Sequence, residues 1–396
     1  MLVQVRKGDS LWYYSQLFSV PLEMIEDANK EGKCEHLPVG STVKIPAYRK
    51  VTVDFQPGDT LWTIAASRKL HVDSLYLLNP HLQNVPQIEI GVPVQVPVRI
   101  ESKLIYGKKK YCYETMMKDI KQLEEIYPFI KTEIIGHSVL GRAIPHIKIG
   151  NGQKHIHING SFHANEWITT AIIMTFINDL LLSLTNKTSL RGLYMYPFYD
   201  EVTLSFVPMV NPDGVDLVLH GADASYKKQV VAINGGSEDF TGWKANIRGV
   251  DLNNQYPANW DIEKERKIPK APAFRDYPGN APLTEPEAII MEELANREQF
   301  DMVLAFHTQG EELYWGYEGC EPNESEALAK EFELVSSYKA VRYVDSHAGY
   351  KDWFIQKYKK PGFTIELGKG VNPLPLSQFD EIYVKSLGIF LASMYI

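Results

Sequence analysis

The sequence predicts an α/β protein in which two small β-α-α-β modules precede one larger domain of alternating strands and helices. Two observations predict this architecture. A motif in the first fifty residues is repeated in the next fifty, and beyond residue 110 apolar strands alternate with helices. The chain has 396 residues, whereas one domain usually has roughly 100–200. Several domains are therefore expected.

The repeat is visible in two pairs of segments. The run GDSLW at residues 8–12 recurs as GDTLW at residues 58–62. After a slip of one residue, GSTVKIP at residues 40–46 recurs as GVPVQVP at residues 91–97. Loops tolerate insertions of this size, so the two stretches are copies of one unit.

Each copy is expected to have the order β-α-α-β. An alternating strand leads to a Gly-Asp turn, after which Ser10 or Thr60 can cap a first helix. A second helix is predicted over residues 21–29 in the first copy and 72–78 in the second, and a strand closes each unit.

This pattern resembles the LysM module, which binds N-acetylglucosamine-containing glycans such as peptidoglycan and chitin. Trp12 and Trp62 are expected to fill the cores, because so small a domain needs large apolar groups. Glycan contact then falls to the loops, where the candidates are Gly8, Asp9, Ser10, Gly58, Asp59 and Thr60. The expected boundaries are residues 1–47 and 50–98 for the modules, 99–110 for a linker and 111–396 for the larger domain.

Composition excludes several kinds of partner. The formal net charge is −8, whereas nucleic acids and anionic membranes require dense cationic contacts, so no nucleic-acid partner is expected. The most apolar run, residues 171–184, contains Asn178 and Asp179 and is shorter than the ~20 residues that span a bilayer. It predicts a buried helix and no membrane span.

The cysteines and the N-terminal segment bear on the cellular compartment. Cys34, Cys112 and Cys320 are expected to be unpaired thiols, because their number is odd and no Cys-x-x-Cys occurs. The N-terminal segment lacks a charged region followed by an apolar run of about 7–15 residues, so no export signal is predicted.

A strand-to-helix transition in the larger domain carries His163 and Glu166. The sequence HIHINGSFHANEW takes an alternating strand into a turn just before an apolar helix, and α/β sheets place ligands at such transitions. His307 follows the apolar strand at residues 302–306. An open zinc site usually takes three nitrogen or oxygen ligands and keeps one position for water. These three residues are therefore predicted to bind zinc.

Three further residues can complete a hydrolytic site. Glu366 lies in the apolar strand GFTIEL, where a carboxylate is costly to bury unless it faces a cleft, so it is predicted to accept a proton from the attacking water. Arg248 can stabilise the negative charge that develops on the carbonyl oxygen. Asp251 can orient a zinc-bound imidazole.

An ordered set of these polar residues resembles that of the zinc carboxypeptidase family, the carboxypeptidase A type: His163, Glu166, Arg248, Asp251, Asn253, His307 and Glu366. The resemblance implies a mixed eight-stranded sheet flanked by helices, and one zinc ion per chain. It also implies that Glu366 acts as general base and then general acid. In the same way, Arg248 would polarise the carbonyl, Asp251 would support the first histidine, and Asn253 would bind substrate.

Two positions depart from the exopeptidases of this family. Those enzymes hold a free C-terminal carboxylate with an arginine directly after the substrate-binding asparagine, and here that position is Asn254. The residue before the metal-binding glutamate is commonly arginine in those enzymes and is Asn165 here. Bidentate capture of the carboxylate by a guanidinium is thus lost. Asn253 and Asn254 stay candidates for substrate binding, but an ordinary carboxypeptidase is not expected.

The phrases HANEW, RGVDLNNQYPANW and HTQGEELYW, together with the LysM pattern, resemble the bacterial γ-D-glutamyl-L-diamino acid endopeptidases. The resemblance implies a zinc metallopeptidase that cuts the bond between γ-D-glutamate and meso-diaminopimelate or lysine in peptidoglycan, while its LysM modules bind the glycan. One alternative is a carboxypeptidase for cell-wall peptides that uses Arg142 or Arg275 for the terminal carboxylate. The other is a non-catalytic wall-binding protein. We expect the protein in the cytoplasm of a sporulating bacterium or on the spore, acting at the wall or cortex; no oligomeric state is predicted.

Overall fold

The computed structural model describes residues 1–30 and 37–396. These residues form two compact units, which comprise Met1–Leu104, Asp119–Lys131 and Asn178–Tyr196 in the first and Ile105–Lys118, Thr132–Ile177 and Pro197–Ile396 in the second. Cys34 lies outside the described residues. Cys112 and Cys320 are free, as predicted.

The first module in the sequence has the predicted order of elements. Strand β1 (Leu2–Gln4) leads to helices α1 (Leu11–Phe18) and α2 (Leu22–Ala28), and β2 (Thr42–Lys44) pairs antiparallel with β1. The Ser10 hydroxyl accepts a hydrogen bond from the Tyr13 backbone N–H, so the predicted helix cap is confirmed.

The second module repeats this order with longer strands. Strands β3 (Tyr48–Asp54) and β4 (Pro93–Arg99) pair antiparallel, and helices α3 (Leu61–Ser67) and α4 (Val72–Leu78) lie between them in the sequence, followed by a short 3-10 turn. Thr60 and Thr63 form a reciprocal capping box at the start of α3.

The prediction that Trp12 and Trp62 fill the module cores is wrong. Their exposed fractions are 62% and 65%. The helix period is the reason, because positions three and four apart share one face. In α3 that face carries Leu61, Ile64 and Ala65, which are buried. Trp62 directly follows Leu61 and therefore points outward.

The second unit is built on a mixed eight-stranded sheet, which confirms the predicted fold class. The strand order is β13-β12-β14-β11-β7-β10-β6-β5. Their bounds are Lys339–Val341, Glu312–Tyr314, Gly362–Leu367, Met302–Thr308, Lys154–Asn159, Val202–Val207, Ala143–Ile149 and Lys131–His137, in that order. The central strands β10, β7, β11 and β14 run parallel to their neighbours within this group.

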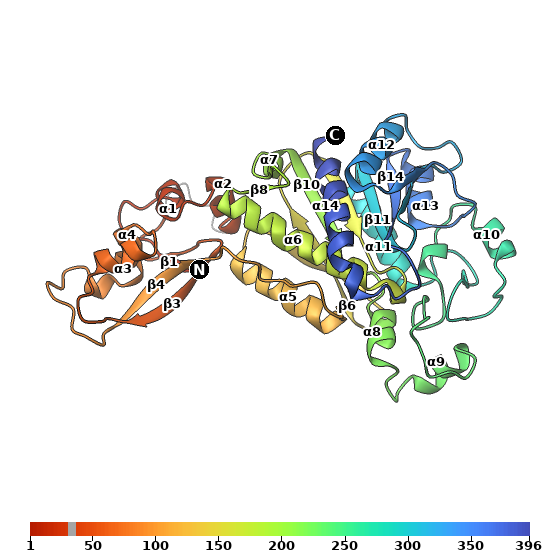
Figure 1. Cartoon of the computed structure of the whole chain (residues 1–396), viewed down its shortest axis with the longest axis horizontal. Helices are drawn as coiled ribbons and strands as arrows, with labels where there is room; N and C mark the ends of the chain where they lie inside the picture. The colour runs from red at the N-terminus through yellow and green to blue at the C-terminus, as the bar shows by residue number, and fades with distance from the viewer. Residues whose placement is uncertain (31–36) are drawn as a thin grey trace. The chain divides into compact units, whose positions relative to one another are not determined.

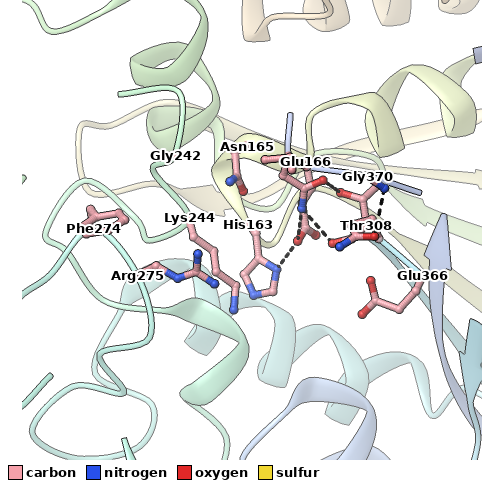
Figure 2. Close-up of a pocket in the computed structure, with 13 residues that line it drawn as sticks. His163, Asn165, Glu166, Gly242, Lys244, Phe274, Arg275, Thr308, Glu366 and Gly370 are labelled. Carbon is pink, nitrogen blue, oxygen red and sulfur yellow. Dashed lines mark hydrogen bonds and ion pairs between the residues drawn. The ribbon is translucent and has the colours of Figure 1, made fainter. Parts of the chain in front are cut away.

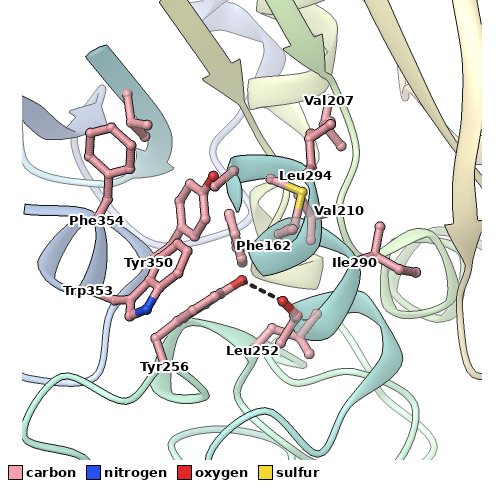
Figure 3. Close-up of a cluster of buried hydrophobic side chains, with 14 of the residues drawn as sticks. Phe162, Val207, Val210, Leu252, Tyr256, Ile290, Leu294, Tyr350, Trp353 and Phe354 are labelled. Atoms are coloured by element: carbon pink, nitrogen blue, oxygen red, sulfur yellow. Dashed lines mark hydrogen bonds between the residues drawn. The ribbon is translucent and has the colours of Figure 1, made fainter. Parts of the chain in front are cut away.

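Helices cover both faces of this sheet (Figure 1). Helix α14 (Phe379–Tyr395) lies beside α6 (Ile168–Asn186), where the rings of Phe176 and Phe390 stack at 4.3 Å, and Phe306 of β11 packs on Phe390. Val303, on the alternate face of β11, belongs to a second cluster that includes α11 and α13 (Figure 3). The cluster helices are α11 (Pro286–Glu298) and α13 (Tyr350–Tyr358).

The remaining helices after the two modules are α5 (Tyr113–Ile126), α7 (Phe198–Glu201), α8 (Pro212–His220), α9 (Lys227–Ile233), α10 (Trp260–Arg266) and α12 (Glu324–Ser336). The apolar run predicted as a buried helix lies in α6. The segment Ala164–Asn186 is long and apolar enough to cross a membrane, but 94% of its most apolar window is buried inside the protein. The expected burial is therefore confirmed.

Candidate active site

The parallel strands at the centre of the sheet bring the predicted metal ligands together. His163 and Glu166 follow the end of β7, where His163 precedes the 3-10 turn Ala164–Glu166. His307 lies near the end of β11, directly opposite Glu366 of β14 in the parallel register. Register partners in neighbouring parallel strands point to the same face, so the base candidate and the third ligand candidate share one face of the sheet.

His163, Glu166 and His307 form a tight buried cluster. His163 Nδ1 lies 2.8 Å from Glu166 Oε1, His307 Nδ1 lies 3.0 Å from Glu166 Oε2, and the two Nδ1 atoms are 3.2 Å apart. The exposed fractions are 5%, 3% and 1%. Burial alone would raise the pKa of Glu166, but the two imidazoles lower it to about 2, so this carboxyl is ionised.

This geometry fits one metal ion. Donor atoms held ~2.0–2.1 Å from a tetrahedral zinc lie about 3.3 Å from one another, and the three donors here have separations of 2.8 to 3.2 Å. Two imidazoles and one carboxylate are also the donor types that open zinc sites use. The structure therefore brings His163, Glu166 and His307 together as a triad with the donor types and spacing that a metal ion requires.

One other trio of possible ligands occurs among the described residues: Glu133, His146 and Glu298. Two cations occupy its carboxylates, because Arg297 pairs with Glu133 and Lys148 Nζ lies 3.2 Å from Glu298. These positive charges oppose a further cation, so this trio is an ion-pair network.

Asp251 lies behind the triad, as predicted for a residue that orients an imidazole. Its Oδ1 is 3.2 Å from His163 Nε2, on the opposite ring edge from the atom facing the metal position. Burial alone would raise the pKa of Asp251, but Lys244 and His163 hold it well below its usual range. An ionised acceptor here fixes which nitrogen of His163 faces the triad.

The cation beside the triad is Lys244, which the sequence reasoning missed. Its ammonium lies 3.0 Å from Asp251 Oδ2 and 3.4 Å from Asp276 Oδ1. Burial would lower the pKa of Lys244, but these carboxylates raise it, so the group is charged. Lys244 directly follows Trp243, which is fully buried. A lysine next to a large apolar residue could have indicated that this segment lies inside the protein.

The expected place of Arg248 at the cavity is corrected by the structure. Its side chain is half exposed and Nη1 lies 3.4 Å from Glu285 Oε2, away from the residues around the triad. The local turn explains this direction. The Asn246 side-chain oxygen accepts hydrogen bonds from the backbone N–H groups of Arg248 and Val250, and Gly249 between them has a φ of 77°.

Glu366 and two members of the triad, His163 and Glu166, line one cavity of about 460 Å³ (Figure 2). The residues around it are His163, Asn165, Glu166, Gly242, Lys244, Phe274, Arg275, Thr308, Gln309, Glu366, Gly370, Val371 and Asn372. Burial raises the pKa of Glu366 to about 8, and the Glu166 carboxylate adds to this rise. A metal cation at the triad would oppose this rise, which suits a group that must accept and release a proton.

The two substrate-binding candidates lie outside the set of residues around the cavity. The Asn253 side-chain oxygen accepts from the Tyr350 backbone N–H at 3.1 Å, and Asn254 is buried, with its amide donating to the Asn253 carbonyl. Asn165 does contribute to the cavity wall. A substrate role for Asn253 or Asn254 stays a prediction.

The glycan-binding candidates occupy equivalent turns of the two modules. Gly8 and Gly58 have φ values of 89° and 85°, which side chains rarely adopt, so these glycines form the turns. The Asp9 carboxylate accepts from Tyr14 and Arg6, whereas Asp59 accepts from the Gln56 backbone N–H. Asp9 is thus already engaged within the protein. Ser10 and Thr60 serve as helix caps.

Comparisons with known proteins agree with this arrangement. The zinc carboxypeptidase family model matches residues 116–386, and the LysM domain model matches residues 3–46 and 54–97. Gamma-D-glutamyl-L-diamino acid endopeptidase 1 of Lysinibacillus sphaericus is 52% identical over 399 residues, which cover 100% of both chains.

Two further similarities each cover most of the chain. Uncharacterized protein YqgT of Bacillus subtilis is 46% identical over 304 residues, covering 75% of this chain and 81% of that protein. The crystal structure of thrombin activatable fibrinolysis inhibitor superposes with a TM-score of 0.58 at 15% identity, covering 88% of this chain and 98% of that chain. At this identity the likeness shows the fold alone.

Proposed function

This chain belongs to the zinc carboxypeptidase family and is a zinc-dependent metallopeptidase, and from that premise we propose that it hydrolyses the γ-D-glutamyl-L-diamino acid bond of peptidoglycan stem peptides. The observation that carries the proposal is the 52% identity, over the whole of both chains, to an enzyme named for that bond. The absence of arginine at Asn165 and Asn254 supports endopeptidase action, because neither position offers a guanidinium to a free C-terminus.

The residues around the cavity divide the chemistry among them. His163, Glu166 and His307 would hold the zinc ion, which when bound would supply Lewis-acid chemistry to water and to the scissile carbonyl. Glu366 accepts the proton of the attacking water and later gives it to the leaving amine. Lys244 places positive charge where the carbonyl oxygen becomes negative.

The test uses defined muropeptides with products identified by mass spectrometry. We expect L-Ala-γ-D-Glu-diamino acid peptides to yield L-Ala-D-Glu and the peptide that begins with the diamino acid. Glu366→Gln should retain zinc, measured by elemental analysis, and lose turnover. The control Glu292→Gln, which removes a partly buried carboxylate paired with Lys357, should retain both. Full activity of Glu366→Gln would contradict the proposed role.

The two N-terminal modules belong to the LysM family and indicate glycan binding. We propose that they hold the enzyme on peptidoglycan and so raise the effective concentration of stem peptides at the cavity. Binding to insoluble peptidoglycan, competed by N-acetylglucosamine oligomers, tests this proposal. Action at the wall or cortex of a sporulating cell stays a prediction, which localisation of a tagged protein during sporulation can test.

Arg275 supports one alternative, a carboxypeptidase for cell-wall peptides. It contributes to the cavity wall and could hold a terminal carboxylate, whereas Arg142, the other cation considered, pairs with Asp213 and Asp216 at 2.9 and 3.0 Å. Stem peptides that end at the diamino acid should be compared with peptides extended beyond it. A strict need for the free terminus would favour the alternative.

A further inference from the structure

Arg275 presents unused hydrogen-bond donors at the cavity. Its Nε donates to Asp276 at 2.8 Å, and no other acceptor among the described residues pairs with its guanidinium. Its side chain is 53% exposed. Figure 2 shows Arg275 on the same side of His163 as Lys244, with Glu366 on the other side. The two terminal nitrogens are therefore available to a ligand in the cavity.

The surrounding charges leave Arg275 only partly neutralised. The Asp276 carboxylate also lies 3.4 Å from Lys244 and 3.9 Å from Lys267, so three cations share this one anion. Lys244 has a second partner in Asp251, at 3.0 Å. Among these cations, the Arg275 guanidinium would thus bind an incoming anion most strongly. Its planar pair of N–H groups matches the geometry of a carboxylate.

A γ-linked glutamate carries such an anion. When its side-chain carboxyl forms the scissile bond, its α-carboxyl stays free and ionised on the acyl side of that bond. In an α-linked glutamate the free carboxylate lies on the side chain instead. The free α-carboxylate is therefore a charged feature that a γ-glutamyl substrate with an unmodified α-carboxyl brings to the cavity.

We propose that Arg275 binds the free α-carboxylate of the γ-D-glutamyl residue and thereby selects γ-linked substrates. This inference rests on the proposed function. The carboxylate of the diamino acid is the competing ligand, but in an endopeptidase substrate the chain continues from that carboxyl as an amide. A cation built for that group would therefore discriminate against the extended stem peptides that an endopeptidase cleaves.

The test compares three synthetic peptides of the form L-Ala-γ-D-Glu-diamino acid. The first has both α-carboxylates free, the second has the D-glutamyl α-carboxyl as a carboxamide, and the third has the diamino acid carboxyl as a carboxamide. We expect kcat/KM of the wild type to be at least roughly tenfold lower for the second peptide than for the first, because the second peptide loses its charge-assisted hydrogen bonds to the guanidinium. The first and third peptides should be cleaved alike.

Arg275→Gln should remove this preference by slowing the first peptide to the rate of the second. Arg275→Lys, which keeps the charge and loses the bidentate geometry, should fall between. The matched control is Arg297→Gln, a half-exposed arginine that pairs with Glu133 and Glu298, and it should preserve the preference. Binding to Glu366→Gln by calorimetry gives a readout without turnover. Adding Arg275→Gln should weaken binding of the first and third peptides, which both keep the D-glutamyl α-carboxylate, and leave binding of the second unchanged.

The outcomes separate the two proposals. Cleavage of the first and second peptides at equal rates by the wild type would overturn the role of Arg275 and leave the proposed function intact. A preference that follows the diamino acid carboxylate would also overturn it and favour the carboxypeptidase alternative. If Arg275→Gln lowered kcat/KM equally for the first and second peptides, Arg275 would not select γ-linked substrates and the proposal would be overturned. Cleavage of none of the three peptides would overturn the proposed function itself.

Discussion

Replacing Glu287 with glutamine should make the free energy of unfolding depend less on pH. This carboxyl is fully buried at the start of α11, where it accepts from the Val139 backbone N–H at 3.0 Å and approaches the Asn246 amide at 3.4 Å. Burial raises the pKa of Glu287 to about 7, and the Asp213 carboxylate adds to this rise, whereas the hydrogen bonds lower it. No cation pairs with it among the described residues.

The magnitude follows from the two pKa values. The folded value is about 7 and the reference value is 4.5, and each unit corresponds to about 1.4 kcal/mol. Between these values the folded state keeps the proton and the unfolded state has lost it, so the free energy of unfolding falls as pH rises. The protonated Glu287 carboxyl makes its full contribution to stability below pH 4.5. This contribution, about 3 kcal/mol in all, is lost as the pH rises from 4.5 through 7.

The assay is urea denaturation of the wild type and Glu287→Gln, followed by tryptophan fluorescence at several pH values from 4.5 to 8. Subtracting the free energy of unfolding of the variant from that of the wild type at each pH cancels the effect of all other titrating groups. We expect the wild type to lose about 3 kcal/mol relative to the variant across this range. A constant difference would show that Glu287 titrates normally and would refute the reasoning.

Three further predictions concern the site and the modules. Lys244→Gln should lower kcat by roughly 10²–10³-fold with little change in KM, because one donor to the developing oxyanion is lost. Steady-state kinetics on a muropeptide would instead show a raised KM and an unchanged kcat if Lys244 only bound substrate. Asp251→Asn should weaken zinc binding about 10–100-fold, since the neutral amide orients His163 less well, and chelator competition measures this directly. The double variant Trp12→Ala/Trp62→Ala should bind insoluble peptidoglycan more weakly than the wild type, because both rings are exposed and can stack on sugars. Its circular dichroism spectrum should stay unchanged. Unchanged binding would exclude the two rings as glycan contacts.

The metal triad was accessible from the sequence for a physical reason. His163, Glu166 and His307 adjoin strands whose apolar runs are recognisable, and parallel strands end at one edge of the sheet. Glu366 could be found because a carboxylate within an apolar strand needs a special environment. The apolar runs thus predict which strands carry these polar residues at or near their ends.

Turns and helix phase limited the remaining predictions. In the segment from Lys244 to Asp251 either cation could have faced the triad, and a turn held by the Asn246 side chain decides for Lys244. Residue size alone suggested that Trp62 is buried, whereas the phase of α3 places Leu61 and Ile64 inside. These outcomes depend on local hydrogen bonds and on where a helix begins, which composition does not encode.

The pairing of His307 with Glu366 on adjacent strands has a consequence for how such an enzyme can diversify. The spacing between the ligand and the base is set by the sheet ladder, which loop changes leave untouched. Arg275 lies outside helices and strands, on a segment that tolerates substitution. Reaction chemistry and bond selection are thus carried by separate parts of the chain, so new substrates can be acquired by loop changes alone while the hydrolytic step is inherited intact.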